Sequence, residues 1–84
     1  MKSFLSFKKE QTKVTFPSTQ LRFGDVKING TKVGTWIQNC EMLYHAKFNF
    51  EGHVRNAWGS SKQRMVMATR EIIERNLPTV QIMY

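Results

Sequence analysis

Two histidines are the residues of this sequence best suited to acid–base chemistry. His45 and His53, with Lys47 between them, suggest a ribonuclease in which one histidine acts as acid and the other as base. The strand register predicted below separates them by four residues, which at ~3.3 Å per residue is about 13 Å. That distance is too long for both histidines to flank one phosphorus atom.

The other reactive residue types do not form a catalytic or metal-binding set. The six acidic residues are scattered, and the sequence has no phosphate-binding loop of the Walker type. Cys40 is the only cysteine, which excludes an internal disulfide and a thiolate zinc site, and its neighbours offer no base. We therefore predict a protein that is not an enzyme and needs no cofactor or metal.

The chemistry that the sequence does favour is the binding of polyanions. Thirteen lysines and arginines face six acidic residues, which gives a net charge of +7 over 84 residues. Nucleic acid is the first expected partner, before anionic lipid and an acidic protein. No apolar run approaches the ~20 residues of a membrane span, and the opening residues lack an apolar signal segment. We expect a cytoplasmic protein, in the host cytoplasm if it is viral, with no membrane partner.

The segment DVKINGTKVGTW predicts a β-hairpin. Asn29-Gly30 lies between two alternating runs, as in a two-residue type I′ turn. Lys27 and Lys32 then share one face, which Trp36 joins if no bulge intervenes at Gly34, so the exposure of Trp36 stays open. The expected pairs are Ile28 with Thr31, Lys27 with Lys32, and Val26 with Val33. Short strands on either side of Pro17-Ser18 would add to this sheet.

A second hairpin is predicted in LYHAKFNFEGHVRNAW, with two alternative turns. A two-residue Glu51-Gly52 turn would pair Phe50 with His53 and place Arg55 on the face of Phe48. A three-residue turn from Phe50 to Gly52 is preferred, because it separates apolar from polar side chains. It assigns Tyr44, Ala46, Phe48, Val54 and Trp58 to the core and His45, Lys47, His53 and Arg55 to solvent.

The last third of the sequence predicts an amphipathic helix from Ser61 to about Asn76. Ser60 and Gln63 fit a capping box, with Ser60 as the N-cap. Asn76-Leu77-Pro78 would end the helix, because the residue before a proline is disfavoured in the helical region. Helical spacing gathers onto one face Met65, Ala68, Thr69, Ile72 and Ile73.

These elements predict an α+β fold in a single domain spanning residues 1–84. A small antiparallel sheet of three to five strands, built from two hairpins, would pack on one C-terminal amphipathic helix. Residues 1–13 would form a short helix capped by Ser3 or a flexible arm, and residues 79–84 an edge strand or a docking tail.

The sheet face turned to water and the helix start would together form the nucleic-acid-binding surface. Lysines and arginines would neutralise phosphates, an exposed aromatic ring would stack on an unpaired base, and the helix N-terminus would attract anions. The expected contact residues are Lys62, Arg64, Lys47, Arg55, Lys27, Lys32, His53 and Trp36.

The order of hairpin, glycine-containing loop and Ser-Lys helix start resembles the C-terminal half of a double-stranded-RNA-binding domain. The likeness covers about residues 43–76, with residues 58–63 in place of the family's Gly-x-Ser-Lys-Lys segment and Ala68 near its alanine pair. The resemblance implies that Lys62 contacts RNA phosphate, with Arg64 a weaker candidate. In overall character the chain is also similar to small basic early proteins of large phages, some of which bind RNA and disarm host toxins.

The favoured function is therefore RNA binding through phosphate contacts with low sequence specificity, as a phage accessory or anti-host-defence factor. One alternative is an antitoxin-like inhibitor or adaptor that docks on a host nucleic-acid enzyme through Met67, the tail and an edge strand. Another is a sheet-face module that binds DNA. The sequence is compatible with a monomer or a homo-oligomer.

Overall fold

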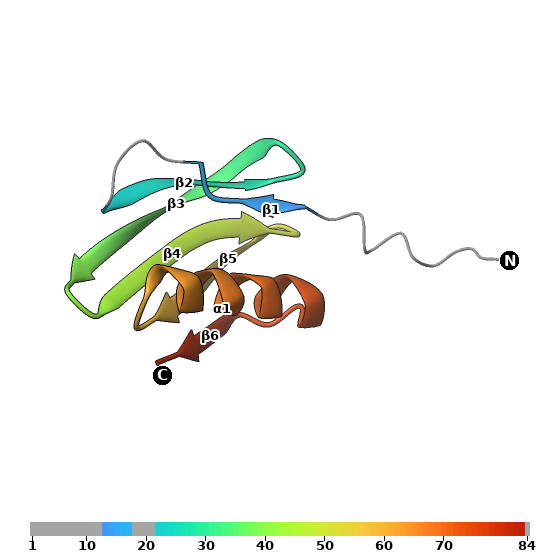
Figure 1. The fold of residues 1–84 in the computed structure, drawn as a ribbon. Helices are drawn as coiled ribbons and strands as arrows, with labels where there is room; N and C mark the ends of the chain where they lie inside the picture. Colours follow the sequence, from blue (N-terminus) through green and yellow to red (C-terminus); the bar gives the residue numbers. More distant parts are fainter. Residues whose placement is uncertain (1–12, 18–21, 84) are drawn as a thin grey trace, which may run out of the picture.

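The computed structural model describes residues 13–17 and 22–83, which form one sheet and one helix (Figure 1). The elements in chain order are β1 (Val14–Thr15), β2 (Phe23–Ile28), β3 (Thr31–Cys40), β4 (Leu43–Phe50), β5 (His53–Gly59), α1 (Lys62–Arg75) and β6 (Thr79–Ile82).

The six strands lie in the sheet in the same order as in the sequence. β1 to β5 are antiparallel neighbours, whereas β6 runs parallel to β5 after the crossover through α1. The sheet curls like half a barrel, and α1 packs on the inner side of β4, β5 and β6 (Figure 1). The predicted sheet of three to five antiparallel strands is therefore wrong. The sheet has six strands, with mixed directions, because the chain returns after α1 to the free edge of β5.

The first hairpin has the predicted turn but not the whole predicted register. Asn29 and Gly30 both have positive φ, and Ile28 and Lys27 pair as expected with Thr31 and Lys32. A β-bulge follows, so Val26 pairs with Gly34 and not with Val33. The extra residue shifts the pairing of the rest of β3 by one residue, so its side chains change faces. As a result Trp36 points to the inner side of the sheet, where only 1% of it is exposed.

The second hairpin adopts the alternative that sequence reasoning disfavoured. Glu51 and Gly52 form a two-residue turn, both with positive φ, and Phe50 pairs with His53. The preferred three-residue turn is therefore wrong. Because side chains alternate along a strand, the one-residue shift exchanges the two faces of β5. Val54 and Trp58 leave the core, and Arg55 enters it.

The hydrophobic core lies between the curled sheet and the buried face of α1. That face carries four of the predicted helix residues, Met65, Ala68, Thr69 and Ile72, while Ile73 is partly buried. The sheet side of the core consists of Val26, Trp36, Ala46, Phe48 and Ala57.

The ends of α1 have identifiable caps. Ser61, and not Ser60 as predicted, is the N-cap, and its hydroxyl accepts a hydrogen bond from the Arg64 amide. The helix ends at Asn76, as predicted from the Asn-Leu-Pro sequence, and Asn76 adopts the left-handed conformation. Gly59, at the end of β5, lies against the first turn, since a Cβ there would be 2.2 Å from the Met65 amide nitrogen.

Candidate nucleic-acid interface

The sheet face turned away from α1, called the outer face below, carries a row of largely apolar side chains. The strand register places Phe23 of β2, Ile37 of β3, His45 of β4 and Trp58 of β5 directly beside one another. Phe23 is 53% exposed and Ile37 is 47% exposed. A continuous ridge of this kind, with no described element packed over it, is unusual on the surface of a small basic protein.

The centre of this row is a stacked pair of rings. The imidazole of His45 lies on the indole of Trp58, with ring centroids 3.7 Å apart and planes inclined by 5°. His45 Nε2 also lies 2.8 Å from Oδ1 of Asn56, which fixes the imidazole from the neighbouring strand. The expectation that Trp58 belongs to the core is wrong, and sequence reasoning missed this pair. The Glu51-Gly52 dipeptide could have indicated it, because a two-residue turn there places Trp58 opposite His45.

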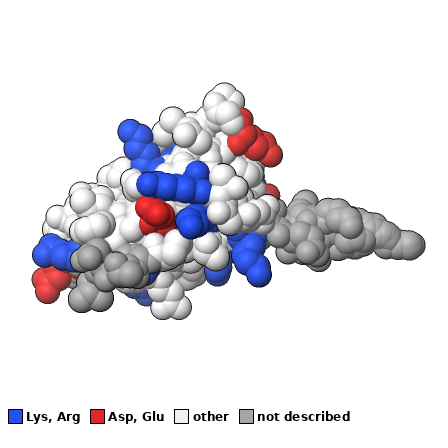
Figure 2. All heavy atoms as spheres, turned by 90° about the horizontal axis from the view of Figure 1, so that it is seen from above, with Lys and Arg blue, Asp and Glu red and all other residues white. Residues whose placement is uncertain are grey.

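Three of the predicted contact residues lie on the outer face. Lys47 is exposed two residues after His45 on β4 and so lies in the neighbouring row of side chains. Lys27 of β2 and Lys32 of β3 are direct cross-strand partners. Like charges placed opposite each other repel, and Asp25 partly offsets this by an ion pair of 3.4 Å with Lys32. Seen from above, the molecule shows more blue than red side chains (Figure 2). A polyanion on this face would relieve the remaining repulsion.

The two basic residues of the first helical turn lie on the other side of the sheet. Lys62 is exposed, and its Nζ sits 4.7 Å from the ring centroid of Trp36, which it covers. Arg64 donates a hydrogen bond of 3.3 Å from its guanidinium to Oγ of Ser60. Lys62 and Arg64 are therefore separate from Lys27, Lys32 and Lys47, and they make different contacts, one with the Trp36 ring and the other with Ser60.

Arg55 is directed inward, and the expectation that it faces solvent is wrong. Only 5% of it is exposed. Its guanidinium donates hydrogen bonds to the carbonyl oxygens of Phe50 and Leu77 and to Oδ1 of Asn76, at 2.8 to 3.3 Å. These acceptors are neutral, and two of them lie just past the end of α1, where a cation is favoured by the helix dipole. Arg55 thus joins the β4–β5 turn to the end of the helix.

Trp36 and His53 are also separated from the outer face. Trp36 is buried under the helix start, and its Nε1 has no hydrogen-bond partner among the described residues. His53 is exposed beside the Glu51–Gly52 turn, two residues before the inward-facing Arg55 and therefore on the same face of β5, whereas His45 points outward. The two histidines therefore lie on opposite sides of the sheet and cannot act on one phosphate together.

Neither a metal site nor a membrane span is recognisable in the part of the chain that the structure describes. No cluster of three or more His, Cys, Asp or Glu side chains occurs in residues 13–17 and 22–83. The same residues contain no helix of the length and apolar character needed to cross a bilayer. Comparison with protein-family models, with curated proteins and with solved structures found no match.

Proposed function

We propose that the protein binds single-stranded nucleic acid, most favourably RNA, on the outer face of its sheet. Lys27, Lys32 and Lys47 would contact phosphates, and the stacked pair of His45 and Trp58 would receive an unpaired base. The observation that carries this proposal is that the His45–Trp58 ring pair, Lys47 in the adjacent row, and Lys27 with Lys32 in the row after it share one face that no described element covers. Positive charge beside an aromatic platform is the combination typical of proteins that bind single strands.

A single strand suits this face better than a duplex. The bases of a duplex are stacked inside it, so the half-buried indole of Trp58 would find no ring surface of a duplex to contact. Phosphate contacts and base stacking both tolerate any sequence, which agrees with low sequence specificity. The sheet face itself does not distinguish RNA from DNA, and the preference for RNA follows only from the resemblance of about residues 43–76 to double-stranded-RNA-binding domains. In this proposal the protein acts in the cytoplasm, by binding and not by catalysis.

The helix start is not part of the proposed site. Lys62 and Arg64 lie on the far side of the sheet, so one short strand cannot contact them and Lys47 together. Arg55 and Trp36 are excluded as contacts by their burial. The proposed contact residues are therefore Lys27, Lys32, Lys47, His45 and Trp58.

The proposal is tested by equilibrium binding of labelled single-stranded RNA, duplex RNA and single-stranded DNA of equal length at several salt concentrations. Lys47→Glu is compared with Arg70→Glu, which makes the same charge change on α1. We expect Lys47→Glu to weaken binding of the single strands and to reduce the slope of affinity against salt, because a phosphate contact is lost. Arg70→Glu should change binding only slightly.

Equal losses in the two variants would mean that only the overall charge attracts nucleic acid, and the proposed site would be wrong. Tighter binding of duplex RNA than of the single strands, lost in Lys62→Glu and kept in Lys47→Glu, would move the site to the helix start. Lack of binding at physiological salt by the unmodified chain would reject a nucleic-acid-binding function altogether.

A further inference from the structure

The outer edge of β6 has main-chain groups directed away from the sheet. The amides of Asn56 and Ser60 in β5 and its loop donate to the carbonyl oxygens of Pro78 and Ile82, both at 3.1 Å. In a parallel pair, alternate residues of a strand bond to the same neighbour. Residues 78, 80 and 82 therefore bond toward β5, and the N–H and C=O groups of Thr79, Gln81 and Met83 point outward. No described strand lies beyond them.

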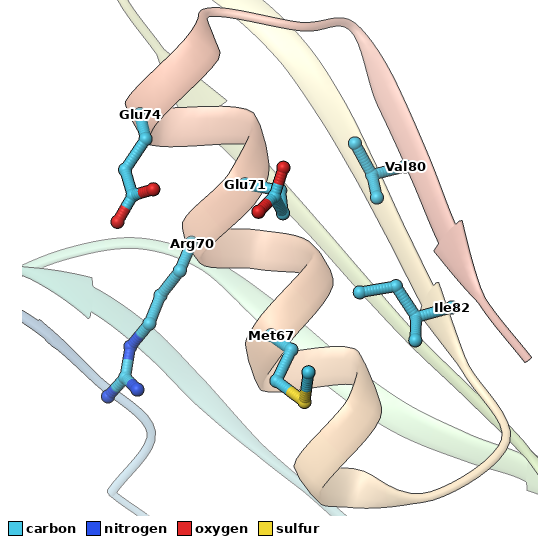
Figure 3. Close-up of a pocket in the computed structure, with 6 residues that line it drawn as sticks. All are labelled: Met67, Arg70, Glu71, Glu74, Val80 and Ile82. Carbon is cyan, nitrogen blue, oxygen red and sulfur yellow. The ribbon is translucent and has the colours of Figure 1, made fainter. Parts of the chain in front are cut away.

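An open groove of about 320 Å³ runs between this edge strand and α1. Met67 of α1 faces Val80 and Ile82 of β6 across the groove, whereas Arg70 and Glu74 point away from the strand (Figure 3). Met67 is 47% exposed, and Val80 and Ile82 are half-buried. Apolar side chains thus adjoin a row of unsatisfied main-chain groups, the combination that accepts an added strand.

We propose that β6 pairs antiparallel with β6 of a second copy of this chain, about a two-fold axis at Gln81. In that register each Gln81 exchanges both main-chain hydrogen bonds with its counterpart, and Thr79 does the same with Met83 of the second copy. Val80 lies opposite Ile82 of the second copy in a close, non-hydrogen-bonded pair. Every outward N–H and C=O group of the three residues is then paired.

The charges on this side of the molecule favour a second copy as the occupant. The exposed side of α1 carries Arg70, Glu71, Glu74 and Arg75. Arg70 and Glu74 point away from β6 (Figure 3), and Glu71 forms an ion pair of 3.2 Å with Arg75. These four side chains sum to zero charge in a chain whose net charge is +7. Two copies can approach each other here without the repulsion that they would meet on the lysine-bearing face.

The opposite edge of the sheet favours a closed dimer over an open polymer. β1 has only two residues, Val14–Thr15, and Pro17 follows it closely. Within the described residues, such a short edge offers few main-chain groups to receive β6 of another copy, which disfavours head-to-tail growth. Self-pairing of β6 uses the same edge on both copies, so neither copy keeps a free β6 edge for a third.

The two-fold axis of an antiparallel pair stands perpendicular to the sheet, so both outer faces would lie on the same side of the joined sheet. The dimer does not depend on the proposed nucleic-acid binding. If both hold, two binding faces would lie next to each other and one strand could span them.

The experiment measures the molar mass of the full chain by sedimentation equilibrium over a range of protein concentrations. The variants are Gln81→Pro and Gln81→Ala. Gln81→Pro removes an outward N–H that β5 does not use, and proline is tolerated on an edge strand. Gln81→Ala keeps that N–H and serves as the control. We expect a dimer for the unmodified chain and for Gln81→Ala, and a folded monomer, checked by circular dichroism, for Gln81→Pro.

Hydrogen exchange gives a readout at single residues. The amides of Thr79, Gln81 and Met83 should exchange slowly in the dimer and fast on dilution, whereas those of Val80 and Ile82 should stay protected in both. If Gln81→Pro does not fold, Gln81→Lys replaces it, because two like charges would then face each other across the axis. A dimer that persists in the folded variant would overturn the proposal. So would an unmodified chain that remains monomeric and whose Gln81 main-chain N–H exchanges fast. The monomeric result would leave the edge to a strand of a different protein.

Discussion

The imidazole of His45 stacks on the indole of Trp58 across β4 and β5, with ring centroids 3.7 Å apart. This pair exists because the Glu51–Gly52 turn sets the register of the hairpin, and because Asn56 holds the imidazole from the side. Trp58 is half-buried, so part of its ring remains accessible on the outer face. The ring pair and Lys47 of the neighbouring row thus share the outer face.

Replacing Trp58 by leucine should separate stacking from electrostatic attraction. Leucine still covers the sheet but has no ring for a base to stack on, and a base stacked on an aromatic side chain contributes ~1–3 kcal/mol. We expect the affinity for single-stranded RNA to fall about tenfold or more. The slope of affinity against salt should stay the same, because no phosphate contact is removed. Unchanged affinity would exclude Trp58 from the site.

Replacing Arg55 by methionine should lower the free energy of unfolding by about 2–3 kcal/mol, because the acceptors on Phe50, Asn76 and Leu77 lose a charged donor. Denaturant unfolding at fixed protein concentration measures this change. RNA affinity, measured where the variant is folded, should be close to that of the unmodified chain.

Arg55→Lys is the control for charge. Lysine keeps the positive charge but lacks the fork of donors that reaches several acceptors at once. It should therefore restore only part of the lost stability. Full recovery with lysine would show that charge near the end of α1, and not the hydrogen-bond geometry, is what the fold requires.

Gly59→Ala should be among the most damaging single substitutions. The added Cβ would lie 2.2 Å from the Met65 amide nitrogen and 2.6 Å from the Arg64 carbonyl carbon, so α1 would have to move away from β5. Forcing extra atoms into a packed region costs about 1–3 kcal/mol or more. Thermal unfolding should show a large fall in Tm or a loss of folded protein.

Gly52→Ala provides the comparison for Gly59. Gly52 has a φ of +81 and open space around it, so alanine there meets only the strain of the left-handed region, about 1–2 kcal/mol. If both alanine variants lost the same stability, the close contact between β5 and α1 would not be the reason that Gly59 is glycine.

Ser61→Ala should reduce stability by about 1 kcal/mol, because the Arg64 amide loses its capping acceptor. Ser60→Ala should have the smaller effect, since it removes only the contact with the Arg64 guanidinium. Denaturant unfolding of the two variants compares them directly. The reverse order of effects would identify Ser60 as the functional cap.

Local signals in the sequence determined the elements that depend on near neighbours. Asn29-Gly30 specified a turn with two positive φ values, and the spacing of Met65, Ala68 and Ile72 specified the buried face of a helix. The stop at Asn76 likewise followed from the residues around it. In each case the relevant contacts lie within a few positions of one another, so the sequence pattern contains them.

Tertiary structure decided which way the strands face. The bulge opposite Val26 moved Trp36 into the core, and the turn at Glu51 carried Arg55 inward and Trp58 outward. Each shift is a single residue, yet it exchanges both faces of a strand because side chains alternate with a period of two.

The position of β6 was likewise set by contacts distant in sequence. β6 lies parallel to β5 because α1 forms the crossover between them, and the four residues of β6 do not indicate which strand they pair with. The sequence by itself determined a basic chain with the Asn29-Gly30 turn and one amphipathic helix, whereas it left two alternatives for the second turn. Only the packed sheet decided which of its rings and charges share a surface, because that depends on register between strands and not on spacing along the chain.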